Sequence, residues 1–150
     1  MPYMYKIIKE LKLNYVKATG TVVGKEIVDT SRKMFKDPEW NYVRKQISDF
    51  REVKELVIEF QEFETIVGVE KEQQEKQEKI HNGETGKLAI VADKELYDII
   101  FKLYEFKTAE GFHETKLFNT LDEALVWLYG TSLNSNKQSD MEKALMELLG

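Results

Sequence analysis

The chain has 150 residues, of which 42% are hydrophobic and 33% charged, with a formal net charge of −5 and no cysteine. A chain of this length can bury roughly 70% of its unfolded surface around one core, and the missing cysteine excludes disulfides, thiol nucleophiles and thiolate metal sites. The acidic balance argues against broad nucleic-acid binding, because the nearest basic patch, Arg44-Lys45, is too small alone.

The N-terminal part of the chain predicts two strands, a helix and a weaker strand. Tyr3–Glu10 and Asn14–Gly20 are rich in β-branched and aromatic residues and predict an antiparallel pair. Gly24–Lys36 has apolar residues at helical spacing and stops before Asp37-Pro38, because the residue before proline disfavours the helix. Val43–Phe50 predicts a strand whose polar residues indicate one thinly covered face.

The middle of the chain predicts a helix over Leu56–Val69. Its apolar stripe consists of Leu56, Phe60, Phe63 and Val67. The next ten residues, Glu70–Lys79, are all Glu, Lys or Gln and contain pairs such as Glu72 and Lys76 at helical spacing. We expect a protruding helical extension here, with mobile coil as the alternative.

The C-terminal part predicts a further alternation of strands and helices. Leu88–Ala92 is an all-apolar run typical of a strand covered on both faces, and Asp93 can cap the helix after it. His113–Phe118 predicts a short strand, and the box formed by Thr120 and Glu123 predicts a last domain helix.

Gly130 can end that helix. We therefore expect one domain over residues 1–130, followed by a linker and a C-terminal amphipathic tail helix over residues 131–150. Whether that helix docks on its own chain or on another copy is left open.

Four motifs carry a resemblance to a known family. They are Ser48–Arg51, Gly86–Asp93, Leu117-Phe118 and Leu121–Leu128. Together they resemble the SpoIIAA-like branch of the STAS superfamily, which consists of small bacterial cytosolic domains. Element order and resemblance imply an α/β fold with a small mixed sheet of four to five strands. The first strand is antiparallel, the others are largely parallel, and helices pack on the sheet.

The resemblance also implies a non-catalytic regulatory or binding role rather than an enzyme. Better-studied relatives switch partners by phosphorylating a serine at the start of the helix after the third strand. The corresponding region here, Asp49–Lys54, has no serine or threonine, so we do not expect that switch. Related lipid-carrier domains suggest a small apolar ligand by analogy of fold alone.

Two groups of residues are candidates for a ligand or partner site. Asp49, Arg51 and Asp93 are expected at the carboxyl ends of adjacent parallel strands, where open α/β sheets bind ligands. Their structural alternative is a helix cap at Asp93 and a local ion pair between Asp49 and Arg51.

The second group is aromatic. Tyr97, Phe101 and Tyr104 follow helical spacing and are offset from the main apolar stripe of their predicted helix. Burial under the chain's own tail or first strand pair, a homodimer interface and the wall of an apolar pocket are all compatible with this pattern.

The sequence thus favours a cytoplasmic binding module without a transmembrane segment. It contains no signal peptide and no apolar run near the roughly 18 residues that span a bilayer. Its histidines, His81 and His113, have no neighbouring ligand at metal spacing, and we expect no metal or other cofactor. The alternatives are a structural homodimerising protein and an enzyme with an unrecognised site at the strand ends.

Overall fold

The computed structural model describes residues 3–80, 86–93, 113–130 and 143. Its strands are β1 (Tyr3–Ile8), β2 (Leu13–Val23), β3 (Lys45–Val57), β4 (Gly86–Val91) and β5 (His113–Phe118). Its α-helices are α1 (Gly24–Lys36), α2 (Phe60–Ile80) and α4 (Leu121–Tyr129). Short 3-10 helices cover Lys9–Leu11 and Pro38–Tyr42.

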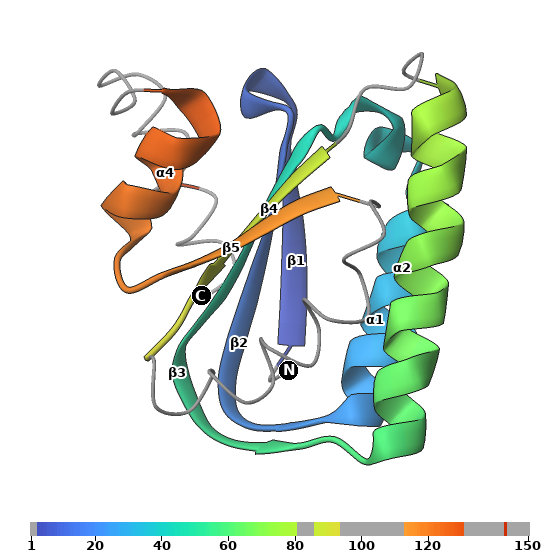
Figure 1. Ribbon diagram of the computed structural model, residues 1–150, viewed down its shortest axis with the longest axis vertical. Coiled ribbons are helices and arrows are strands. Elements are labelled where there is room, and N and C mark those ends of the chain that lie inside the picture. The colour runs from blue at the N-terminus through green and yellow to red at the C-terminus, as the bar shows by residue number, and fades with distance from the viewer. Residues whose placement is uncertain (1–2, 81–85, 94–112, 131–142, 144–150) are drawn as a thin grey trace.

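The strands form a five-stranded sheet in the order β1-β2-β3-β4-β5 (Figure 1). β1 is antiparallel to β2, and the β2–β3, β3–β4 and β4–β5 pairs are all parallel. The predicted fold class is confirmed, with the sheet at the upper end of the predicted strand number. Among the described residues, no helix is long and apolar enough to cross a membrane.

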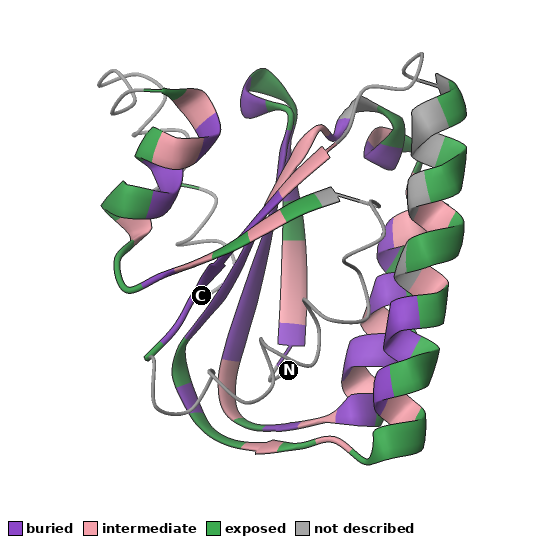
Figure 2. Ribbon diagram, viewed as in Figure 1, coloured by how far each residue is buried: buried purple, intermediate pink, exposed green. Residues whose placement is uncertain are grey.

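Helices cover both faces of this sheet. α1 and α2 lie side by side against one face, whereas α4 lies against the other (Figure 1). The alternation of β2 follows from this arrangement, because Val16 joins the core under α1 and α2 while Tyr15 joins the core under α4. Figure 2 shows the central strands buried along much of their length.

β3 differs from its prediction in length and burial. It runs from Lys45 to Val57, well past the expected end at Phe50, and α2 begins at Phe60 rather than at Leu56. Two register shifts against β2 interrupt the period-two pattern, so that Phe50 and Val53 both reach the core of α1 and α2. The spacing of the buried Phe50 and Val53 resembles that of a helix. This explains why the sequence predicted the strand to end at Phe50 and the helix to begin at Leu56.

The predicted apolar stripe of α2 and the predicted thin cover over one face of β3 were also wrong. Phe60 is 64% exposed, and the buried side of α2 is built from Phe63, Ile66 and Val67. Residues 47–50 are all buried, so neither face of β3 is thinly covered there.

The predicted boundaries of α1 and α4 agree with the structure, and the helix predicted after Asp93 lies outside the described residues. α2 continues through the charged run to Ile80, so the helical alternative is confirmed. Thr120 Oγ1 accepts a hydrogen bond from Glu123 N at 3.2 Å, and Gly130 ends α4 with a φ of 78°. Apart from Lys143, the predicted linker and tail helix lie outside the described residues.

Candidate functional site

The aromatic candidates Tyr97, Phe101 and Tyr104 lie outside the described residues, and their role stays a prediction. The polar candidates are described. Asp49 and Arg51 lie inside β3 rather than at its end, which corrects the expected position. Asp49 is nevertheless the register partner of Val91, the last residue of β4.

Asp93 follows the end of β4 and is exposed. The hydrogen bonds and ion pairs that join Asp49 to Arg51 and Lys17 do not include Asp93. A shared ligand site of Asp49, Arg51 and Asp93 stays a prediction. The strand order is also sequential across the sheet. The crevice that open sheets offer to ligands arises where the strand order reverses, and no reversal occurs among the described strands.

The structure instead brings Asp49 and Arg51 together with two residues of β2. Asp49 Oδ1 accepts hydrogen bonds from the Arg51 backbone N–H at 3.1 Å and from Arg51 Nε at 2.9 Å. Asp49 Oδ2 accepts from Arg51 Nη2 at 2.8 Å and from the Tyr15 hydroxyl, and Lys17 Nζ lies 3.5 Å away. We call Tyr15, Lys17, Asp49 and Arg51 the Asp49 cluster.

A β-bulge shapes this cluster. Lys17 pairs with Asp49, but Thr19 pairs with Glu52, so β3 has one residue more than β2 between these points. The Asp49 carboxylate accepts the Arg51 N–H at the bulge and so satisfies a backbone donor. The same bulge allows Lys17 Nζ to approach Glu52 Oε2 at 3.3 Å.

The cluster is buried at its centre and open at one side. The side chain of Asp49 is 0% exposed and that of Lys17 5%, whereas that of Arg51 is 41% exposed. An ion so deeply buried is tolerated only when it is paired and hydrogen-bonded. The bidentate guanidinium contact is the strongest pairing that a carboxylate can obtain from a side chain.

The pKa values of Asp49, Tyr15 and Arg51 move away from neutrality. Burial alone would raise the pKa of Asp49, but hydrogen bonds from Arg51 and Tyr15 outweigh it and hold this pKa below its ordinary value. Burial and the hydrogen bond to Asp49 raise the pKa of Tyr15 far above the ordinary range. The hydrogen bond to Asp49 likewise raises the pKa of Arg51.

The predicted ion pair of Asp49 and Arg51 is therefore present, while Tyr15 and Lys17 were missed. Their sequence signal is weak. Leu13, Tyr15 and Lys17 follow period two in a predicted strand, which places a lysine on an otherwise apolar face. Only the register of β2 against β3 shows that this lysine meets a carboxylate.

The sequence predicts Asp49–Lys54 at the start of the helix after the third strand, but the segment lies within β3. The helix that follows β3 begins with Phe60–Phe63, and this first turn also lacks serine and threonine. Among the described residues, no group of His, Asp or Glu side chains is arranged to hold a metal ion.

Comparisons with known proteins give one structural likeness. No family model matches the sequence, and no curated protein matches it. The chain is similar to the crystal structure of an uncharacterized protein of the DUF3478 family, with a SpoIIAA-like fold, from Shewanella loihica PV-4. The two share 17% identity with a TM-score of 0.47, and the match covers 84% of this chain and 91% of that one.

Proposed function

We propose that this protein is a non-catalytic regulatory or binding module that binds a protein partner or a small apolar ligand. The observation that carries this proposal is the internal neutralisation of the Asp49 cluster. Arg51 and Lys17 both contact the Asp49 carboxylate, and the Tyr15 hydroxyl donates a hydrogen bond to the same carboxylate. These contacts occupy the groups that a catalytic site would direct toward a substrate.

The protonation states support the same proposal. General acid–base catalysis is most efficient when the pKa of the catalytic group lies near the operating pH. Asp49 has a lowered pKa, and those of Tyr15 and Arg51 are raised, so none of these groups exchanges a proton near neutral pH. We infer that the cluster fixes the bulge of β3 rather than performing chemistry.

The contact surface of this module is proposed from the sequence. Tyr97, Phe101 and Tyr104 are aromatic residues at helical spacing beyond the core stripe of the predicted helix. A surface of this kind suits an apolar ligand, a partner helix or a second copy of the chain. Homodimerisation through this surface is the structural alternative to ligand binding.

Native mass spectrometry of the full chain tests the proposal, because one spectrum reports both stoichiometry and any bound mass. We expect a retained small ligand, a retained partner or a dimer, and we expect the double variant Tyr97→Ala/Phe101→Ala to lose it. An unchanged spectrum would reject this surface. A turnover that disappears in a folded Asp49→Asn or Asp93→Asn variant would reject the non-catalytic role.

A further inference from the structure

Basic residues gather at the end of the sheet where the parallel strands begin. The carbonyl of Lys12 accepts hydrogen bonds from Arg44 N at 2.9 Å and Lys45 N at 3.2 Å. Lys87 N in turn donates to the Arg44 carbonyl at 3.2 Å. These backbone bonds bring segments that are distant in the sequence together at the end of the sheet where β2, β3 and β4 begin. We call Lys12, Arg44, Lys45 and Lys87 the basic edge.

Lys45 and Lys87 of the basic edge lie against aromatic rings of α4. Lys45 and Lys87 are register partners on β3 and β4. Lys45 Nζ lies 4.5 Å from the ring centroid of Tyr129, and Lys87 Nζ lies 5.1 Å from that of Trp127. Like charges on directly paired strand positions repel each other. Ring faces attract ammonium groups but do not neutralise their charge.

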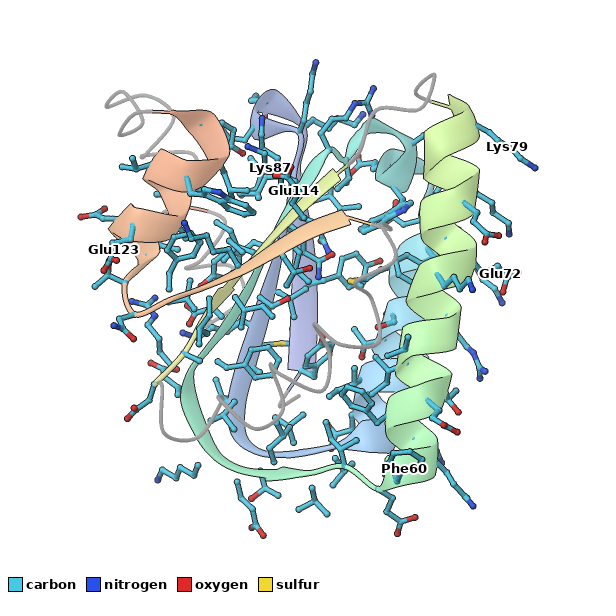
Figure 3. The ribbon with its side chains drawn as sticks, in the orientation of Figure 1. Phe60, Glu72, Lys79, Lys87, Glu114 and Glu123 are labelled. Atoms are coloured by element: carbon cyan, nitrogen blue, oxygen red, sulfur yellow. The ribbon has the colours of Figure 1, made fainter. Side chains whose placement is uncertain are left out.

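Lys12 and Lys87 differ from the cations of the Asp49 cluster in their ion pairing. Among the described residues, no salt bridge joins Lys12 or Lys87 to an acidic side chain. The nearest register neighbour with a negative charge is Glu114, which pairs with Lys87 across β4 and β5 and is exposed. Figure 3 shows Lys87 and Glu114 next to each other, with Glu123 at the other end of α4.

The backbone at Lys12 gives independent support. Lys12 has φ 53° and ψ 37°, and it is the non-glycine residue with positive φ in the described part of the chain. The left-handed conformation favours glycine or asparagine, because a Cβ is crowded there. Strained backbone of this kind persists where the surroundings over-determine it and often marks functional sites. Lys12 also caps the end of the 3-10 helix Lys9–Leu11, where its N–H donates to the Lys9 carbonyl at 3.0 Å.

We propose that the basic edge binds the phosphate or carboxylate group of a small anionic ligand. Lys12 and Lys87 donate to the anion, and the partly exposed ring of Trp127 contacts the remainder of the ligand. This inference rests on the proposed function as a binding module and adds an anionic ligand class to it. Neighbouring strands lie about 4.8 Å apart, so these two basic positions are spaced for a single anionic group, and two ammonium groups are too few for the repeated phosphates of a nucleic acid.

Titration of the full chain with inorganic phosphate, and separately with acetate, tests the inference at constant ionic strength. Backbone amide and indole NMR signals report the site. We expect saturable shifts at Lys12, Lys87 and Trp127, larger for the anion type that the natural ligand carries. Shifts that stay linear in anion concentration, or that spread evenly over the surface, would overturn the inference.

Matched variants separate binding from packing. Lys87→Met keeps the aliphatic stem over Trp127 and is expected to weaken the anion affinity about threefold, as loss of one partly exposed charge contact. Glu114→Gln removes the flanking carboxylate and is expected to strengthen the affinity about twofold. Lys76→Met is the control, because its ammonium lies on α2, 3.9 Å from Glu72. Equal effects of the Lys76 and Lys87 variants would overturn the inference.

Native mass spectrometry distinguishes this inference from the broader proposal. A retained partner or apolar ligand without anion binding at the basic edge would reject the inference and leave the binding module in place. Anion-induced shifts accompanied by chemical conversion of the bound anion would reject the non-catalytic role and leave the basic edge as the binding site.

Discussion

The Asp49 cluster and the basic edge lie at opposite ends of the pairing between β3 and β4. Lys45 pairs with Lys87 where the two strands begin, and Asp49 pairs with Val91 where β4 ends. Both groups collect cations from separate segments of the chain. In the cluster the Asp49 carboxylate pairs with Arg51 and Lys17, whereas at the basic edge Lys45 and Lys87 lie over aromatic rings.

The difference follows from burial. Lys17 and Asp49 are almost completely removed from water, so either charge alone would carry a large desolvation penalty. Lys45 and Lys87 are only partly buried, and their ammonium groups can stay hydrated while their stems cover apolar surface. Lys87 can therefore offer its positive charge to a ligand, whereas the buried and paired Lys17 cannot.

The largest predicted effect comes from breaking the cluster at its centre. Asp49→Ala leaves the Lys17 ammonium buried without its central partner and removes the acceptor of the Arg51 N–H at the bulge. We expect the free energy of unfolding to fall by about 3–5 kcal/mol. Urea denaturation followed by circular dichroism measures this loss.

Glu52→Gln is the matched control for that variant. It removes the other carboxylate near Lys17, but Glu52 is 57% exposed, so the expected loss is below about 1 kcal/mol. The double variant Lys17→Met/Asp49→Asn should recover part of the stability, because it removes the buried charges together. Similar losses for Asp49→Ala and Glu52→Gln would show that burial does not control the energetics of the cluster.

Acid should weaken the Asp49 cluster. Because the folded-state pKa of Asp49 lies below its ordinary value of 3.8, the unfolded chain binds a proton first as the pH falls. The contribution of Asp49 to stability is complete above that value and is lost as the pH falls toward the folded-state pKa. Unfolding measured from pH 6 to pH 2 should be less steep in Asp49→Asn. Parallel curves for the two proteins would contradict this prediction.

Much of the fold was predictable because its signals are local. The antiparallel first pair, the helix that stops before Asp37-Pro38 and the capping box at Thr120 each depend on neighbouring residues. The extent of β3 was not predictable in this way. Its bulges depend on pairing with β2, and they change the spacing of buried residues to one that resembles a helix.

The residues of the candidate site also divide into those with a local sequence signal and those that only strand pairing brings together. The pair of Asp49 and Arg51 lies within a short stretch of sequence and was predicted as an ion pair. Tyr15 and Lys17 join it only through strand register. The basic edge is the clearest case, because Arg44-Lys45 alone is too small to matter until backbone hydrogen bonds place Lys12 and Lys87 beside it.

A smaller effect is expected from removing one hydrogen bond of the cluster. Tyr15→Phe keeps the ring in the core but deprives Asp49 of a donor, and hydrogen bonds to charged groups contribute about 1.5–3 kcal/mol. The variant should also differ at alkaline pH. The raised pKa of Tyr15 means that the unfolded chain loses this proton above pH 10 while the folded chain keeps it. Wild-type stability should therefore fall more steeply above pH 10 than that of Tyr15→Phe, as alkaline urea titrations would show. An equal fall in both proteins would exclude Tyr15 as the source.

The smallest effect has the opposite sign and concerns the basic edge. Lys12→Gly relieves the left-handed backbone, a gain of about 1–2 kcal/mol, but increases the entropy of the unfolded chain, a loss of about 0.5–1 kcal/mol. We therefore expect a net stabilisation below about 1.5 kcal/mol, measured as a higher midpoint of thermal unfolding.

The same variant should bind phosphate more weakly, because it removes one ammonium of the basic edge. Lys12→Asn separates the two effects, since asparagine tolerates the left-handed conformation without supplying a positive charge. A stabilised Lys12→Gly variant that binds phosphate as the wild type does would show that the lysine is not retained there for the anion. If Lys12→Gly raises the stability and lowers the phosphate affinity, the strained residue of this turn belongs to the binding site. In the Asp49 cluster, by contrast, each single substitution is expected to lower the stability.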